Sequence, residues 1–185
     1  MFVPLRFQPA EPPAEDAFQL LLACHERIRG FCALALKLAR LEEVPPHERA
    51  EAAARLERYF SLALPRHVED EDLSLAPRVL AAGPSPAVLL ALLEMTRQHA
   101  ELDRVLATLL PAWRAVAAEP GRCPVELTGD SERLAAHMEA HLRLEEEVIF
   151  PAARTLLPPE EAKAVLTELR ARRTPGPPSQ AGGTP

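Results

Sequence analysis

Apolar residues recur every three or four positions over most of this chain, which is the spacing of helices that bury one face. The first such stretch covers residues 14–43 and contains no proline. Its expected buried stripe consists of Phe18, Leu21, Leu22, His25, Ile28, Cys32 and Leu36. The pattern therefore predicts one amphipathic helix over residues 14–43.

Prolines mark where the other predicted helices begin, end or bend. Pro45 and Pro46 stop the first helix and open a second one to residue 82, since proline is tolerated in a first turn. Pro65 and Pro77 lie inside this second helix and predict kinks there. Further helices are expected over residues 86–118 (kinked or frayed near Pro111), 130–157 (capped by Asp130 or Ser131, after a loop over 119–129) and 158–173.

The composition agrees with a helical protein. Gly is scarce, with seven residues, and Ile occurs only at positions 28 and 149, so a β sandwich or a βαβ fold is disfavoured. We expect an all-α, antiparallel up-and-down four-helix bundle over residues 14–173, with a short extra C-terminal helix. Residues 1–13 are expected to form an extended lead-in, and residues 174–185 a disordered tail.

The charge pattern narrows the classes of partner. The net charge is −6 and no cluster of Lys and Arg is evident, so neither nucleic acid nor an anionic membrane is an expected partner. The N-terminus does not resemble a signal peptide, and the three cysteines form no C-x-x-C pair. We therefore expect a cytoplasmic protein with reduced thiols.

A 74-residue repeat relates six polar residues. His99 follows His25 by 74 residues, His141 follows His67 by 74, and Glu145 follows Glu71 by 74. The same offset joins Pro77 to Pro151. Each half of the chain therefore carries one His on its first helix, then His-x-x-x-Glu and a later Pro on its second.

Helix geometry turns this repeat into a predicted metal centre. Residues four apart share one face of a helix, so each His-x-x-x-Glu pair points the same way. Buried imidazoles and carboxylates are costly without partners, and a metal removes that cost. Two shared carboxylates and four histidines suit two metals, with iron favoured over manganese or zinc by the nitrogen and oxygen donors. The predicted ligands are His25, His67, Glu71, His99, His141 and Glu145. No Glu-x-x-His motif of the ferritin-like bundles is present.

These motifs resemble the hemerythrin-like (HHE cation-binding) family over about residues 14–157. The resemblance implies a four-helix bundle with a non-haem di-iron centre. Members of the family bind oxygen, sense iron or oxygen, decompose peroxide, or handle nitric oxide. The oxygen carriers have an extra His where this chain has Met95, and their last carboxylate stands five residues after the His, where this chain has Glu146.

Several alternatives stay open at this point. The leading hypothesis is a di-iron protein that binds or reacts with O2, peroxide or NO; the alternative is a non-catalytic iron- or oxygen-sensing or storage module. Whether it is an enzyme, and its oligomeric state, are undetermined. His137, one turn before His141, is a possible seventh ligand or access-channel group. Glu145 is favoured over Glu146 as the bridge, and Asp72 and Glu146 are expected to lie off the ligand face.

Overall fold

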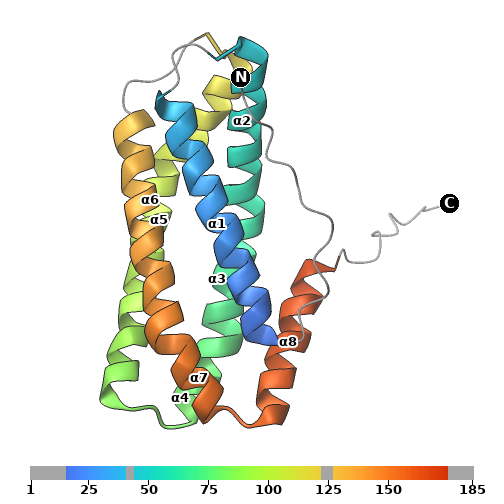
Figure 1. Ribbon diagram of the computed structural model, residues 1–185, viewed down its shortest axis with the longest axis vertical. Coiled ribbons are helices and arrows are strands. Elements are labelled where there is room, and N and C mark those ends of the chain that lie inside the picture. The colour runs from blue at the N-terminus through green and yellow to red at the C-terminus, as the bar shows by residue number, and fades with distance from the viewer. Residues whose placement is uncertain (1–15, 41–43, 122–126, 175–185) are drawn as a thin grey trace, which may run out of the picture.

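The computed structural model describes residues 16–40, 44–121 and 127–174. Within these ranges the chain is helical and has no strand, and four long antiparallel stretches of helix lie side by side (Figure 1). The predicted all-α four-helix bundle with an additional C-terminal helix is confirmed. The expected lead-in over residues 1–13, and the expected tail apart from residue 174, lie outside the described residues.

The first long stretch is α1 (Ala17–Arg40) and the third is α5 (Pro86–Ala118). The second consists of α2 (Pro46–Arg58), the π-helical segment η1 (Tyr59–Ala63), α3 (Leu64–Glu69), the π-helical segment η2 (Asp70–Leu75) and α4 (Ala76–Ala81). The fourth consists of α6 (Leu127–Leu144), the π-helical segment η3 (Glu145–Ile149) and α7 (Phe150–Leu156), and the additional helix α8 (Pro159–Arg173) follows it.

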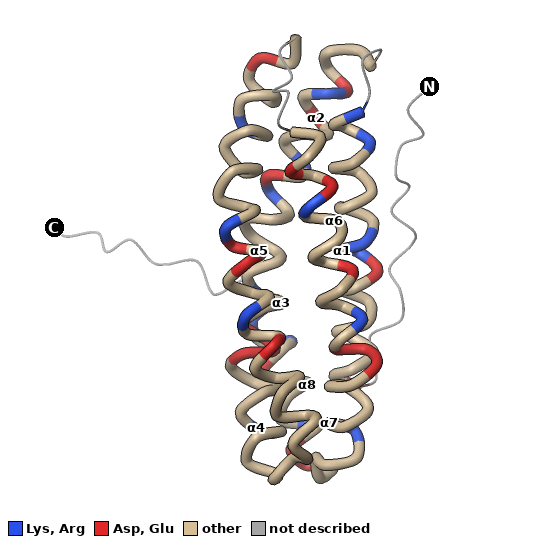
Figure 2. Tube along the Cα trace, turned by 90° about the vertical axis from the view of Figure 1, so that its left-hand side faces the viewer, with Lys and Arg blue, Asp and Glu red and all other residues tan. Residues whose placement is uncertain are grey.

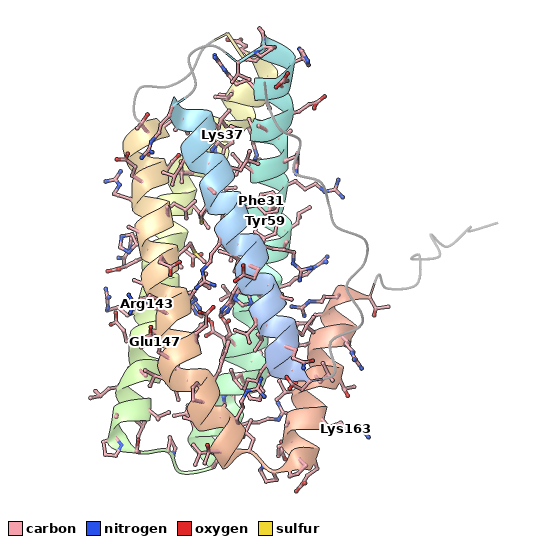
Figure 3. The ribbon with its side chains drawn as sticks, in the orientation of Figure 1. Phe31, Lys37, Tyr59, Arg143, Glu147 and Lys163 are labelled. Carbon is pink, nitrogen blue, oxygen red and sulfur yellow. The ribbon has the colours of Figure 1, made fainter. Side chains whose placement is uncertain are left out.

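The four long stretches form a closed ring. α1 contacts α2 and α6, and α5 contacts the same two helices from the other side. Each stretch therefore packs against its neighbours in sequence, and the last stretch packs against the first. Acidic and basic residues alternate along the outside of this bundle (Figure 2), with surface pairs such as Arg143 and Glu147 (Figure 3).

Each π segment ends two residues before a proline. The backbone N–H of the residue before the proline bonds to the carbonyl five residues earlier, from Leu64 to Tyr59, from Ala76 to Glu71 and from Phe150 to Glu145. The following prolines are Pro65, Pro77 and Pro151. Proline has no N–H and its ring crowds the carbonyl four residues back, so a wider turn accommodates it. The kinks predicted at Pro65 and Pro77 are thus replaced by π turns within continuous helix.

The core consists of two apolar clusters, one above the other along the bundle. Ile28, Phe60 and Trp113 belong to the first cluster, where Phe60 and Trp113 stack with ring centroids 5.3 Å apart. At its edge Phe31 of α1 stacks on Tyr59, with centroids 3.8 Å apart (Figure 3). The second cluster includes Phe18 and the side chains that α8 buries, Val165, Leu166 and Leu169.

Three details differ from the sequence prediction. α6 begins at Leu127, three residues before the predicted cap at Asp130, because the buried Leu127 packs into the first cluster. α5 continues as α-helix through Pro111 to Ala118. On α1, Leu22 is exposed while Leu38 is buried, since the helix turns its face slightly from the predicted stripe.

Candidate metal centre

The six residues related by the 74-residue repeat come together at one level of the bundle. They are His25 on α1, His67 on α3, Glu71 on η2, His99 on α5, His141 on α6 and Glu145 on η3. All six are buried, and the most exposed of them, His99, shows only 6% of its surface. Their neighbours along each helix belong to the two apolar clusters, so the six form a polar layer between these clusters.

The layer contains two groups of donor atoms that share both carboxylates. In each group, one atom from every residue lies within 4.8 Å of the others. Position A is the group His25, His67, Glu71 and Glu145. Position B is the group Glu71, His99, His141 and Glu145. Each position thus has two imidazoles of its own and the same two carboxylates as the other.

The Nε2 atoms of all four imidazoles face the carboxylates. On the position A side, His25 Nε2 lies 3.1 Å from Glu145 Oε2, and His67 Nε2 lies 3.0 Å from Glu71 Oε1. The corresponding distances for position B are 3.3 Å from His99 Nε2 to Glu71 Oε2 and 3.2 Å from His141 Nε2 to Glu145 Oε1. Each carboxylate therefore faces one imidazole of each position.

The residues present fit bound cations. All four oxygens of Glu71 and Glu145 are buried without a hydrogen-bond partner, as are the Nε2 atoms of His25, His67 and His99. Buried polar atoms are nearly always paired, and leaving so many unpaired in an apolar core would cost several kcal/mol. Two cations, one at each position, would satisfy these atoms.

On their outer side the imidazoles contact a second set of polar residues. His25 Nδ1 is 2.7 Å from Glu146 Oε1, and His99 Nδ1 is 3.2 Å from Asp72 Oδ1. His141 Nδ1 is 3.1 Å from Gln98 Oε1, and the thiol of Cys24 interacts with His67. Partners of this kind fix the ring orientation and the tautomer of a metal-binding histidine.

These outer partners obey the same repeat. Glu146 follows Asp72 by 74 residues, and Gln98 follows Cys24 by 74. Asp72 and Glu146 were expected off the ligand face, and they contact the histidine contributed by the opposite half of the chain. Cys24 and Gln98 were not found from the sequence, because their side chains differ in type and only their offset relates them.

The surroundings of Glu146 and Asp72 differ in charge. Arg29 binds both oxygens of Glu146, at 2.9 and 3.0 Å. The equivalent of Arg29 in the second half is Asp103, whose negative charge acts on Asp72. The pKa of Asp72 is raised by burial and by nearby carboxylates, whereas Arg29 and His25 outweigh burial and lower the pKa of Glu146. The two halves therefore differ outside the ligands.

Without metal the pKa values of the candidate ligands are shifted in different directions. Burial lowers the pKa of His25 to about 4 and that of His141 to about 3. Burial also acts on His67, but the charge of Glu71 outweighs it and holds the pKa of His67 well above its ordinary value. Burial and the adjacent Glu71 raise the pKa of Glu145. A metal that binds at position A must therefore displace protons.

The remaining histidines lie outside both positions. The side chain of His137 is 40% exposed, and its Nδ1 lies 3.7 Å from Glu101 Oε2 on α5. His47 is exposed near the start of α2. Met95, which occupies the place of the oxygen carriers' extra histidine, is buried in the second apolar cluster.

Taken together, the fold and the site define a helical-bundle protein with a buried histidine–carboxylate cluster suited to cations. The family model of the hemerythrin HHE cation binding domain matches residues 16–153, and the chain belongs to this family. The resemblance drawn from the histidine repeat is thereby confirmed. A search of curated proteins found no match. None of the helices described is long and apolar enough to cross a membrane.

Proposed function

We propose that the protein holds a di-iron centre and binds or reacts with a small ligand, namely O2, peroxide or NO. The observation that carries this proposal is the sharing of Glu71 and Glu145 between two donor groups. A carboxylate with one oxygen toward each position is the usual bridge between two metals. The division of the four imidazoles, two to each position, also supports a count of two metals.

The donor set favours iron. Each position offers two imidazole nitrogens and two carboxylate oxygens, with no sulfur among the donors. Such sets suit iron, and then manganese or zinc. With four protein donors at each position, a metal that takes six donors would have room for hydroxide and a small ligand. Two Fe(II), two carboxylates and one hydroxide would carry a net charge of about +1, which is tolerable in a buried site.

The chain's own residues would bind the metals, orient the imidazole rings and shield the centre from water. The metals would supply redox and Lewis-acid chemistry toward the small ligand. Glu146 and Gln98 hold the rings of His25 and His141 through their Nδ1 atoms, which leaves Nε2 for the metal. Phe150 stacks on His25, with ring centroids 5.2 Å apart, and covers position A from the second apolar cluster. Such packing keeps bulk water and large substrates away from the centre.

A non-catalytic sensing or storage module is the second candidate. The position of the layer between the two apolar clusters favours it, because occupancy of this layer would change the stability of the whole bundle. In that case the protein binds its ligand or iron without turning over a substrate.

Metal analysis and a visible spectrum of freshly purified protein, made in iron-replete medium, test the proposal. We expect about two iron ions per chain and the absorption of a coupled pair. Anaerobic addition of peroxide or NO then separates the two candidates, since only a reactive centre consumes either repeatedly. One zinc ion and no iron would contradict the di-iron assignment.

A further inference from the structure

Helix α8 lies beyond residues 16–153, the part of the chain that the family model matches. It packs against η2 and α1, and Figure 1 shows it beside the start of α1. Its buried leucines and valine join the second apolar cluster, and several of its charged side chains contact η2 and α4. These polar contacts are centred on a buried carboxylate, which apolar packing of α8 does not require.

A fully buried carboxylate lies at the centre of the contact. Asp70 of η2 is 0% exposed, and two arginines at the end of α8 bind it. Arg172 Nη1 is 2.8 Å from Asp70 Oδ1, and Arg173 binds the other oxygen of Asp70. A buried carboxylate is costly unless it is paired in this way, so the contact fixes how α8 sits on η2.

A second row of contacts continues the same surface. Ser74 Oγ donates to Glu168 Oε2 at 2.6 Å and accepts from Arg172 Nη2 at 2.7 Å. Arg78 binds Glu168 Oε1 at 2.7 Å and Glu161 Oε2 at 2.8 Å. The polar stripe of Asp70, Ser74 and Arg78 therefore meets α8 along three of its turns.

The 74-residue repeat does not hold along this stripe. The equivalents of Asp70, Ser74 and Arg78 in the second half are Leu144, Val148 and Ala152. The adjacent ligand Glu71 and its neighbour Asp72 keep acidic equivalents. The first half thus has a polar stripe where the second half has an apolar one, and the polar stripe is the one that α8 contacts.

Two routes lead from α8 to position A. Asp70 is the residue directly before the ligand Glu71 and lies in the same π turn. Arg173 also donates to Cys24 Sγ at 3.5 Å, and Cys24 interacts with the ligand His67. Arg173 therefore contacts both Asp70, which precedes the donor Glu71, and Cys24, which supports the donor His67.

We propose that α8 is a clamp on position A, in which Arg172 and Arg173 are positioning residues that hold Glu71 and His67 in place for the metal. The inference rests on the two-metal centre proposed above. Outer partners of metal ligands commonly change metal affinity by about 10–100-fold when they are removed. Position A takes both Glu71 and His67, whereas position B takes only Glu71 of these two. Loss of the clamp should therefore loosen the ion at position A more than the ion at position B.

The test follows metal release into excess chelator, using the full chain loaded with Fe(II) under anaerobic conditions. Arg173→Met is the main variant, because Arg172 still binds Asp70 and the buried carboxylate keeps a partner. Lys163→Met is the matched control, since Lys163 is an exposed cation on the outer side of α8 (Figure 3). Two further variants, His67→Ala and His141→Ala, identify which phase of release belongs to position A and which to position B.

We expect Arg173→Met to release the position A ion about 10–100-fold faster than the wild type, with a clearly smaller acceleration of the position B phase. Lys163→Met should behave as the wild type. Equal acceleration of both phases, as a general loss of stability would cause, or no acceleration at all, would overturn the clamp. If Arg173→Met does not fold, Arg173→Lys carries the same test, since it keeps a cation beside Asp70 but lacks the forked donors.

Failure of the di-iron proposal would look different. In that case the wild-type protein itself would not bind about two ions, and no phase could be assigned to either position. A wild type with two ions and an unaltered Arg173→Met profile would refute the clamp alone.

Discussion

At the scale of single residues, the adjacent carboxylates Glu145 and Glu146 have different tasks. Glu145 is fully buried and faces imidazoles of both positions, while Glu146 lies about a quarter exposed behind His25 and is held by Arg29. Neighbouring residues of a helix point in directions that differ by about 100°. The two side chains therefore cannot exchange places without a local shift of the backbone.

Replacing Glu145 by Ala should therefore abolish the two-metal centre. It removes a donor from each position and leaves two cations about 3.5 Å apart with less negative charge between them. Glu146→Ala should keep both ions and release them about 10–100-fold faster, because only the support of His25 is lost. Metal content and the visible spectrum distinguish the two variants. An empty site in Glu146→Ala with a filled one in Glu145→Ala would show that the bridge is Glu146.

At the scale of elements, the π turns connect a repeated proline to the candidate ligands. Glu71 and Glu145 each accept the π-type bond through their own carbonyl, and a proline follows each of them six residues later. Each of these widened turns therefore begins at the glutamate, so the backbone that carries this donor is part of the π segment. The repeat of Pro77 and Pro151 thus has a physical reason beyond helix termination.

Replacing Pro77 by Ala should disturb the centre more than the helix. The new N–H can bond to the carbonyl four residues back, which favours an ordinary α turn and changes the direction of Glu71. We expect near wild-type helicity by circular dichroism but faster metal release. Pro111→Ala is the control, because Pro111 lies in regular helix away from the six donors. If Pro77→Ala and Pro111→Ala release metal at the same rate, the π turn does not position the ligand Glu71.

The docking of α8 should depend on pH through Glu168. Arg78 and Ser74 hold the pKa of Glu168 below its ordinary value of 4.5. A lowered pKa in the folded state means that the ionised form stabilises the fold above pH 4.5, and that this contribution disappears as the pH falls below that value.

Glu168→Gln should accordingly lower the melting temperature of the metal-free protein by about 1–3 °C at pH 7, since the pair is partly exposed. The difference from the wild type should shrink as the pH is lowered through the range below 4.5. Thermal melts at several pH values measure it. A constant difference across this range would mean that the charge of Glu168 does not matter.

Helix periods and the repeat were enough to predict most of the elements and the six residues of the cluster. The helix period is a local signal, since helix geometry places residues four apart on one face wherever the helix lies. The repeat joins distant residues, but it is visible in the sequence without a structure. The π turns were missed because proline alone predicts a kink, and only tertiary packing decides how the crowding is relieved. The roles of Asp70 and Arg173 were missed because their contact joins residues more than 100 positions apart.

At the scale of the whole molecule, the polar layer divides the core into two apolar clusters. Without metal the layer holds two adjacent carboxylates, and their oxygens and the Nε2 atoms of three of the imidazoles have no hydrogen-bond partner, so the layer weakens the contact between the two ends of the bundle. With metal the same layer would join all four long helices.

Removing the metal should therefore destabilise the entire bundle. At free metal concentrations about 100 times Kd, binding adds about 2.7 kcal/mol, which corresponds to about 5–11 °C in Tm for a chain of this size. Acidification should expel the metal, because the imidazoles bind protons in competition with it. Calorimetry of metal-loaded and metal-free protein checks both effects. Equal melting temperatures for the two forms would refute the link between the metal and the fold.

The sharing of carboxylates between halves also orders the events of folding. Position A takes three donors from the first half of the chain and one, Glu145, from the second; position B takes Glu71 from the first half and three donors from the second. Neither helical hairpin holds a complete position alone. Each hairpin can form from local contacts, whereas the centre needs contacts that span more than 70 residues, and such contacts form late. Metals would therefore enter after the hairpins have met, and would stabilise an assembly that the chain must first form without them.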